Sequence, residues 1–232
     1  MKAAPTSVLP TTDDKPRAVE EMFDRIAPRY DLLNRMLTFR MDVGWRRTAV
    51  RELRLAPGAL VLDLACGTGD LCRELASQDL SPIGVDFSAG MLRNAHVAAP
   101  LVRGDALRLP FGTASVDGVV SGFALRNFAA LDPFFAECAR VLRPGGRVAL
   151  LDVAEPSSPQ VRAIHGVWFR RVVPFVGGIV SDRRAYAYLP ASTTYLPSPA
   201  ELALAVARPG FDQVERRTLG FGAAQLLTGT RA

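Results

Sequence analysis

The pattern of apolar and polar positions changes once along the chain, near residue 57. Over residues 19–26 and 32–37 the apolar residues recur at helical spacing, with Pro28 between the two stretches. The turn-forming pair Pro57-Gly58 closes this section. We therefore expect a helical cap over residues 18–56, preceded by a disordered, polar tail at residues 1–17.

Beyond residue 60, short apolar runs alternate with helical stretches. The runs over 60–64, 83–86, 101–102, 116–123 and 147–153 suit strands buried on both faces. Helices are expected over 70–76, over 132–141 and after Ser88, with Ser88 and Asp132 as N-caps. A turn over 143–146 leads into the last of these strands. This alternation predicts a doubly wound parallel sheet.

The last third of the chain adds helices and two closing strands. An apolar, aromatic helical stretch covers Ile164–Val180, another helix lies near 200–207, and strands are expected near 211–218 and 223–230. The pattern predicts one α/β domain over residues 18–232, built on a doubly wound, mostly parallel seven-stranded sheet with helices on both faces. Within it we expect a cofactor-binding core over 57–154 and acceptor-side elements over 155–232.

Composition and charge narrow the class of protein. The chain has 49% hydrophobic and 22% charged residues, and no apolar run approaches the roughly 20 residues that a membrane helix needs. The N-terminus lacks the apolar stretch of a secretory signal, and the three cysteines form no CxxC pair, which argues against a metal site and favours the cytoplasm. The net charge of +5 comes in runs of at most two arginines, so charge alone does not indicate nucleic-acid binding.

A glycine turn follows the first predicted strand, at Asp63-Leu-Ala-Cys-Gly67-Thr-Gly69-Asp70. Glycine lets a ligand approach backbone N–H groups closely, but dinucleotide-binding folds share this feature. Here the third glycine, which lets a helix hold a pyrophosphate, is missing. S-adenosylmethionine has no pyrophosphate, and the carboxylate of Asp63 suits its ammonium group. The turn therefore favours S-adenosylmethionine, with Asp63, Gly67 and Gly69 as binding residues.

Two further carboxylates follow predicted strands. Asp86 ends the second strand, where a carboxylate can accept protons from both ribose hydroxyls. Asp105 follows the third strand and could receive the exocyclic amine of adenine, while the N–H of Ala106 meets a ring nitrogen. Each acid taken singly could equally be a helix cap or a surface charge. Three acids in order, each at a strand end, favour a shared binding site over three unrelated caps or surface charges.

Three longer motifs carry a resemblance to a known family. The first runs over Met22–Leu32 with Asn34 and Trp45, the second over Phe123–Phe128, and the third over Tyr186–Pro190. With these motifs, the chain from residue 19 to its end resembles the menaquinone/ubiquinone C-methyltransferases, class I enzymes that methylate a carbon of a prenylated quinol ring.

The resemblance implies an enzyme that uses S-adenosylmethionine, with demethylmenaquinol and menaquinol as the expected substrate and product. It places cofactor contacts at the five positions Thr68, Asp86, Asp105, Ala106 and Gly122. The family often has serine at this last position, whereas here the serine stands one residue earlier, as Ser121. Tyr30 and Phe123 are expected on the acceptor side, although Tyr30 could instead pack the helical cap against the core.

Methylation of a quinol carbon requires that a neighbouring hydroxyl lose its proton. Arg126 could stabilise the resulting oxyanion, Asn127 could orient the ring oxygen, and Asp152 is the candidate base. We therefore assign Arg126, Asn127 and Asp152 to catalysis. The alternative is structural: Arg126 pairs with an acid, and Asp152 accepts bonds from nearby N–H groups.

The apolar stretch Ile164–Val180 could be core or lid, or could form a prenyl channel and touch anionic lipid. The expected location is therefore the cytoplasm, with peripheral contact at the inner face of the membrane. The sequence departs from the family at Pro190–Ser192 and at Gln225–Arg231, both on the acceptor side. These departures leave open another quinone or a phenolic acceptor.

Two other classes of function stay open. A nucleic-acid methyltransferase would fit the basic charge, but the Ser121–Asn127 stretch lacks the polar clamp that amino-methylating enzymes need after the fourth strand. A non-catalytic cofactor-binding protein is the other alternative. An oligomer is compatible with the pattern, which does not itself indicate one.

Overall fold

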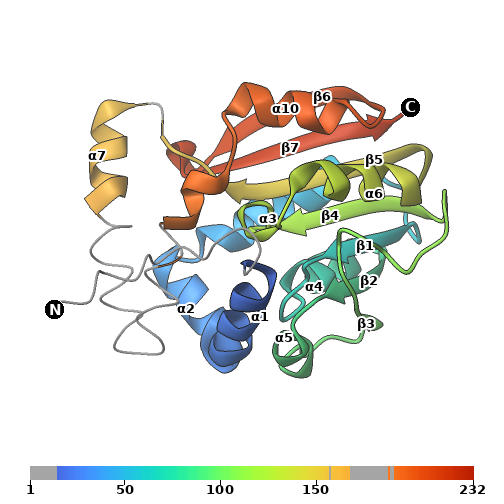
Figure 1. Ribbon diagram of the computed structural model, residues 1–232, viewed down its shortest axis with the longest axis horizontal. Coiled ribbons are helices and arrows are strands. Elements are labelled where there is room, and N and C mark those ends of the chain that lie inside the picture. The colour runs from blue at the N-terminus through green and yellow to red at the C-terminus, as the bar shows by residue number, and fades with distance from the viewer. Residues whose placement is uncertain (1–14, 157, 168–187, 189–190) are drawn as a thin grey trace, which may run out of the picture.

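The architecture is a seven-stranded sheet with helices on both faces, which confirms the predicted fold class (Figure 1). The computed structural model describes residues 15–156, 158–167, 188 and 191–232. The strand order is β3-β2-β1-β4-β5-β7-β6. The strands are β1 (Leu60–Leu64), β2 (Ser81–Asp86), β3 (Leu101–Arg103), β4 (Val116–Gly122), β5 (Leu142–Val153), β6 (Phe211–Leu219) and β7 (Ala224–Arg231).

The first five strands run parallel, and β7 pairs antiparallel with both β5 and β6. The chain reverses from β1 outward to β3 and then continues on the other side of β1 with β4. In an open α/β sheet, ligands bind at the carboxyl ends of the strands where the strand order reverses. The topology therefore places the functional site beyond the ends of β1 and β4.

Two apolar clusters fix the helices on the two faces of the sheet. One joins α3 (Met41–Glu52) and α4 (Asp70–Ser77) to residues such as Val61 and Val120, which point to that face. The other joins α6 (Leu131–Val141) and α10 (Pro199–Ala207) to Leu62 and Leu64 on the opposite face. Because successive side chains of a strand alternate, Asp63 lies on the same side as Val61, against α4.

The helical cap is confirmed, with an earlier start than predicted. Helix α1 spans Lys15–Ile26, a short 3₁₀ turn carries Pro28, and α2 (Tyr30–Leu37) precedes α3. Lys15 is buried, and its Nζ donates to the carbonyl of Phe128 at 2.7 Å while lying 3.9 Å from the centre of the Tyr195 ring. The cap is therefore tied to the core from its first residue, which the sequence had assigned to the tail.

Two local predictions are wrong. Ala130, without a side-chain bond, is the N-cap of α6, because the helix begins at Leu131; Asp132 instead lies in the first turn, where a negative charge is favourable. Residues 143–146, expected as a turn, form the first part of β5, and the pairing register with β4 shifts beside them. The N-cap at Ser88 is confirmed: its side chain accepts from the N–H of Met91 in α5 (Ala89–Arg93).

The acceptor-side segment is described in part. Helix α7 covers Pro159–Val167, whereas residues 168–180 of the predicted aromatic stretch lie outside the described residues, as does most of the Tyr186–Pro190 motif apart from Tyr188. Of the helices described, none is long and apolar enough to cross a membrane. The described residues also contain no group of three or more His, Cys, Asp or Glu side chains that could hold a metal ion.

Candidate functional site

A pocket opens beyond the carboxyl ends of the central strands, where the topology predicts a ligand. It holds about 710 Å³ of empty space, including its open mouth. The end of β2 and the segment after β3 form one wall, where Asp86, Asp105 and Ala106 lie. Helix α1 forms the opposite wall with Val19 and Phe23. Three predicted binding residues from two separate strand ends thus converge on one cavity.

The glycine turn has the backbone conformation that its glycines suggest. Gly67 and Gly69 both have positive φ, at 56° and 85°. Gly69 precedes α4 as its N-cap, and a Cβ there would lie 2.6 Å from Cγ1 of Val97. A Cβ on Gly67 would meet nothing closer than Sδ of Met91 at 4.0 Å. Gly69 is therefore required for packing, whereas Gly67 leaves the approach to the turn open.

Asp63 is a fully buried carboxylate beneath this turn. Its Oδ2 accepts from the backbone N–H of Cys72 at 3.1 Å and from the Cys72 thiol at 3.3 Å, while Oδ1 has no partner among the described residues. Burial raises the pKa of Asp63 to about 7. A buried acceptor without a partner is costly unless a ligand completes it. Asp63 therefore fits the ammonium group expected from the sequence.

Asp86 joins the glycine turn to the pocket. Its Oδ2 accepts from the N–H of Gly67 at 2.7 Å, and its Oδ1 accepts from the N–H of Ser88 at 2.8 Å. Burial raises the pKa of Asp86 to about 6 despite these bonds, and the nearby charge of Asp24 adds to the shift. Each carboxylate oxygen keeps a further lone pair. The side chain is thus fixed by the backbone and can still accept from a pair of hydroxyls.

Asp105 and Ala106 form the far end of the pocket. The Oδ1 of Asp105 accepts from the N–H of Leu107 at 2.9 Å, which fixes an exposed carboxylate at the pocket wall. Ala106 is buried beside it. On the other wall lies Asn127, whose Nδ2 is 3.5 Å from the carbonyl of Phe123 and whose Oδ1 accepts from Tyr188 at 3.2 Å. Asn127 therefore shares a pocket with the predicted adenine contacts.

At the end of β4, Ser121 and Gly122 make different contacts. Oγ of Ser121 donates to the carbonyl of Leu64 at 2.8 Å, so this serine joins β4 to β1. A Cβ on Gly122 would approach Leu71 to 2.9 Å. The hydroxyl of Ser121 therefore binds within the sheet, and the close approach of Leu71 favours glycine at position 122.

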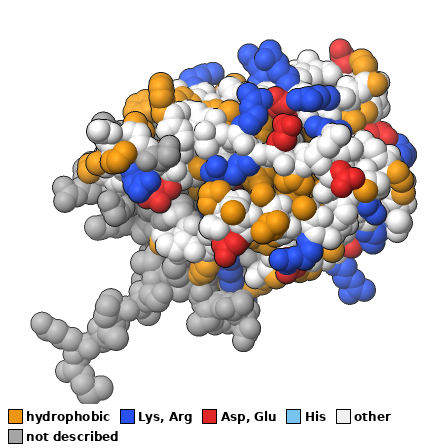
Figure 2. Space-filling model, turned by 90° about the horizontal axis from the view of Figure 1, so that it is seen from above, with side chains coloured by type: hydrophobic (Ala, Val, Ile, Leu, Met, Phe, Trp, Pro, Cys, Tyr) orange, Lys and Arg blue, Asp and Glu red, His pale blue; other side chains and the backbone are white. Residues whose placement is uncertain are grey.

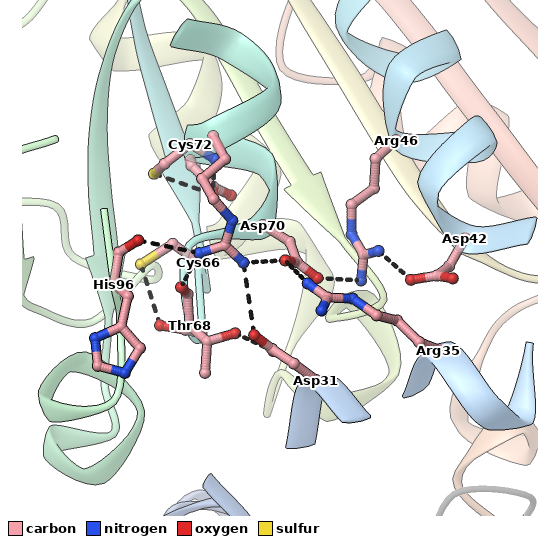
Figure 3. A network of polar contacts seen from close by, with 12 residues as sticks. Asp31, Arg35, Asp42, Arg46, Cys66, Thr68, Asp70, Cys72 and His96 are labelled. Carbon is pink, nitrogen blue, oxygen red and sulfur yellow. Dashed lines mark hydrogen bonds and ion pairs between the residues drawn. The ribbon is translucent and has the colours of Figure 1, made fainter. Parts of the chain in front are cut away.

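A network of charged side chains ties the cap to the glycine turn (Figure 3). The hydroxyl of Thr68 donates to the carboxylate of Asp31 on α2, and Arg73 lies 3.5 Å from the same carboxylate. Asp70, at the start of α4, pairs with Arg73, with Arg35 at 3.4 Å and with Arg46 at 3.3 Å. The side chain of Thr68, a predicted cofactor contact, is thus held by the cap.

Arg126, just after β4, and Asp152, near the end of β5, form a buried ion pair. Nη1 of Arg126 lies 2.5 Å from Oδ1 of Asp152 and also donates to the carbonyl of Phe123 at 2.8 Å. Oδ1 of Asp152 accepts in addition from the N–H of Val153. Nε of Arg126 and Oδ2 of Asp152 have no partner among the described residues. The pair that the sequence left as an alternative exists, and each member keeps one free atom.

Tyr30 and Phe123 lie close to this ion pair. Phe123 has a positive φ of 61°, and its ring faces Trp45 at 6.3 Å and the guanidinium of Arg46 at 5.6 Å. Burial raises the pKa of Tyr30, while the positive charges of Arg126 and Arg46 oppose that shift. Tyr30 is therefore near enough to Arg126 to respond to its charge, on the side of the cap that faces the core.

The sequence missed Asp24, which joins the cap to the pocket. Its Oδ1 accepts from the hydroxyl of Ser88 and from the N–H of Gly90 at 2.8 Å. Glycine at position 90 is required, because a Cβ there would lie 2.6 Å from that oxygen. The signal was present, since Asp24 stands in the first family motif and Ser88 was predicted to cap α5.

Comparisons with known proteins show which family the sequence matches. The sequence model of the ubiE/COQ5 methyltransferase family matches residues 11–231. A "Demethylmenaquinone methyltransferase" of Roseiflexus castenholzii is 43% identical over 97% of this chain and 98% of its own. A "Ubiquinone/menaquinone biosynthesis C-methyltransferase UbiE" of Geobacter sulfurreducens is 37% identical over 94% of this chain and 90% of its own.

Solved structures share the fold. A methyltransferase of Thermotoga maritima, described as SAM-dependent, superposes with a TM-score of 0.66 at 18% identity, covering 92% of this chain and 99% of its own. At this level of identity the likeness concerns the fold alone.

Proposed function

Because the chain belongs to the ubiE/COQ5 methyltransferase family, we propose that it transfers a methyl group from S-adenosylmethionine to a carbon of a prenylated quinol ring. The observation that carries the proposal is the pocket in which Asp86, Asp105 and Ala106 meet. The hydrogen bond from Gly67 to Asp86 connects this pocket with the glycine turn, and below the turn Oδ1 of Asp63 has no partner in the described part of the chain.

The residues fit the parts of S-adenosylmethionine in chain order. Asp63 would hold the ammonium group, Asp86 the ribose hydroxyls, and Asp105 with Ala106 the adenine. The backbone at Gly67, Thr68, Gly69 and Gly122 would line the path between them. When bound, the cofactor supplies an electrophilic methyl group.

The chain's own residues would prepare the acceptor. Oδ2 of Asp152 and Nε of Arg126 have no partner within the described ranges. Oδ2 of Asp152 takes the proton of the quinol hydroxyl, and the Nε–H of Arg126 stabilises the oxyanion. As the ring carbon beside that oxygen forms its bond to the methyl carbon, the bond from that methyl to sulfur would break and leave its electron pair on sulfur. The ring carbon would then release its own proton to solvent, which restores the aromatic ring, and the phenolate oxygen would recover the proton held by Asp152. Tyr30 and Phe123 would hold the ring. Much of the acceleration comes from alignment in a dry site.

The names of the relatives favour demethylmenaquinol as the acceptor. A prenylated quinol is a membrane lipid, so we place the reaction at the inner face of a membrane. The test is a comparison of short-chain acceptors: the enzyme should methylate a demethylnaphthoquinol faster than a benzoquinol. A preference for the benzoquinol, or for a simple phenol, would redirect the proposal to that acceptor.

A further inference from the structure

Exposed apolar side chains gather on the outer side of the helical cap. Eight large apolar side chains are exposed in the described part of the chain, and four of them lie within ten residues of one another. They are Leu32 (56% exposed), Met36 (48%), Phe39 (66%) and Met41 (40%). Leu32 and Met36 are four residues apart on α2 and therefore share one side of the helix. We call these four residues the cap face.

The cap face lies at an ordered corner between α2 and α3. Phe39 and Arg40 both have positive φ, 51° and 62°, a conformation that side chains disfavour. Backbone bonds nevertheless close the corner, from Arg40 to the carbonyl of Arg35 at 2.9 Å and from Met41 to that of Thr38 at 3.0 Å. The exposure therefore belongs to an ordered corner rather than to a frayed helix end.

The charge around the cap face is strongly basic. Residues 25–47 contain six arginines and two aspartates, whereas the whole chain has 28 basic and 23 acidic residues. Of the six arginines only Arg46 is buried, and Arg35 and Arg47 pair with acids of α4. Both aspartates point inward: Asp42 is 1% exposed and pairs with Arg46, and Asp31 bonds Thr68. By contrast, basic and acidic side chains alternate over the α10 side of the molecule (Figure 2). An apolar tip with a basic surround complements an anionic lipid surface.

The adjoining side of the same helix reaches the functional site, because Asp31 and Arg35 directly precede Leu32 and Met36 in the sequence and lie about 100° from them around the helix. Asp31 bonds Thr68 in the glycine turn, and Arg35 contacts Asp70 at the start of α4 (Figure 3). Tyr30 lies on the same helix, where burial raises its pKa and the nearby charge of Arg126 opposes that rise. A surface that holds Leu32 and Met36 would therefore lie within about one helix diameter, roughly 10 Å, of the residues that α2 contacts in the glycine turn.

We propose that the cap face docks on an anionic lipid bilayer and so brings the mouth of the acceptor site to the membrane. The inference rests on the proposed function, because a prenylated quinol partitions into the bilayer. A protein partner fits less well, since stable interfaces bury about 800 Å² on each side and exclude charge from their centre. Here four apolar side chains are interspersed with arginines.

Vesicle flotation tests the docking. The full-length protein is mixed with vesicles of phosphatidylcholine, with or without phosphatidylglycerol, and the bound fraction is measured. Binding should require phosphatidylglycerol, and the double variant Leu32→Ser/Met36→Ser should weaken it about ten-fold, because two inserted apolar side chains are lost. Arg40→Glu should weaken it further in low salt. Leu204→Ser, a change at a 64% exposed leucine on α10, is the matched control and should bind like wild type.

Methyl transfer to a short-chain, water-soluble quinol separates this inference from the proposed function. The double variant Leu32→Ser/Met36→Ser should keep wild-type turnover with that acceptor and should lose turnover when a long-chain quinol is supplied in vesicles, whereas the control Leu204→Ser should match wild type with both acceptors. Equal binding of wild type and the double variant would overturn the docking surface. So would salt-independent self-association through the cap face without vesicle binding. Absence of transfer to any quinol would instead refute the function and leave the flotation result valid.

Discussion

The carboxylate of Asp24 on α1 accepts a hydrogen bond from the hydroxyl of Ser88, the residue that caps α5. The same oxygen accepts from the N–H of Gly90 at 2.8 Å, and the N–H of Ser88 in turn donates to Asp86. A residue of the cap thus positions the carboxylate that we assign to the ribose. The cap covers the pocket and also shapes it.

Asp24→Ala should therefore weaken both the fold and the cofactor site. Loss of an acceptor at the start of α5 should lower the free energy of unfolding by about 1–2 kcal/mol. The dissociation constant for S-adenosylmethionine should rise several-fold, as measured by calorimetry. Removal of the neighbouring charge should also lower the pKa of Asp86 and shift the pH profile of binding to lower pH.

Glu20→Gln on the same helix is the control for Asp24→Ala. Glu20 pairs with Arg103 at 3.0 Å, but the arginine is 60% exposed, so the change should cost well under about 1 kcal/mol. If Glu20→Gln and Asp24→Ala had equal effects, the contact with Ser88 would have no special role.

Gly69→Ala tests the packing of the glycine turn. The new Cβ would lie 2.6 Å from Val97 at a φ of 85°, so we expect a loss of about 2–4 kcal/mol in unfolding free energy. Gly145→Ala has nearly the same φ, 78°, but its Cβ would meet nothing within 4 Å, and it should cost about 1 kcal/mol. If urea unfolding gave equal losses of stability for the two variants, the side chain of Val97 would move aside without cost.

Asp63 makes the stability of the ligand-free protein depend on pH. Its pKa is raised from 3.8 to about 7, so its contribution is fully present below pH 4 and is lost as pH rises through 7. Asp63→Asn keeps an acceptor for Cys72 and removes the ionisation. Relative to wild type, this variant should gain on the order of 4 kcal/mol between pH 4 and pH 8. Parallel stability curves for the two proteins would contradict the raised pKa.

Substitutions in the Arg126–Asp152 pair distinguish a structural role from a catalytic one. Arg126→Met leaves a buried charge unpaired and should cost about 3–5 kcal/mol, whereas Arg143→Met, which breaks a half-exposed pair with Asp117, should cost under about 1 kcal/mol. Asp152→Asn should lower kcat at least about 100-fold with little change in KM for the cofactor. A stable Asp152→Asn enzyme with unchanged kcat would leave the pair a purely structural role.

The sequence predicts well the features that follow from the local pattern of strands and helices. Strand ends in a parallel sheet converge, so the order of Asp63, Asp86 and Asp105 sufficed to place them around one region. Asp132 was misplaced as a cap because nothing in the local pattern distinguishes a helix that begins at Leu131 from one that begins a residue later.

Contacts between distant segments were not predictable. Lys15 bonds a carbonyl 113 residues away, and Asp24 bonds Ser88 across 64 residues. Both side chains look like ordinary surface charges in the sequence, because helical periodicity tells which side of α1 is polar and not which polar residues meet a partner. The hydrogen bond between Thr68 and Asp31 could not be predicted for the same reason.

Transfer of label from S-adenosylmethionine is the most direct test of the proposed reaction. The protein is incubated with methyl-labelled cofactor and reduced demethylmenaquinone, and the extracted lipid is analysed by mass spectrometry, with Asp86→Ala in parallel. We expect one labelled methyl group on a ring carbon, and much less product with Asp86→Ala at limiting cofactor. Label on oxygen, or no label in the quinol while the cofactor still binds, would contradict the proposed reaction.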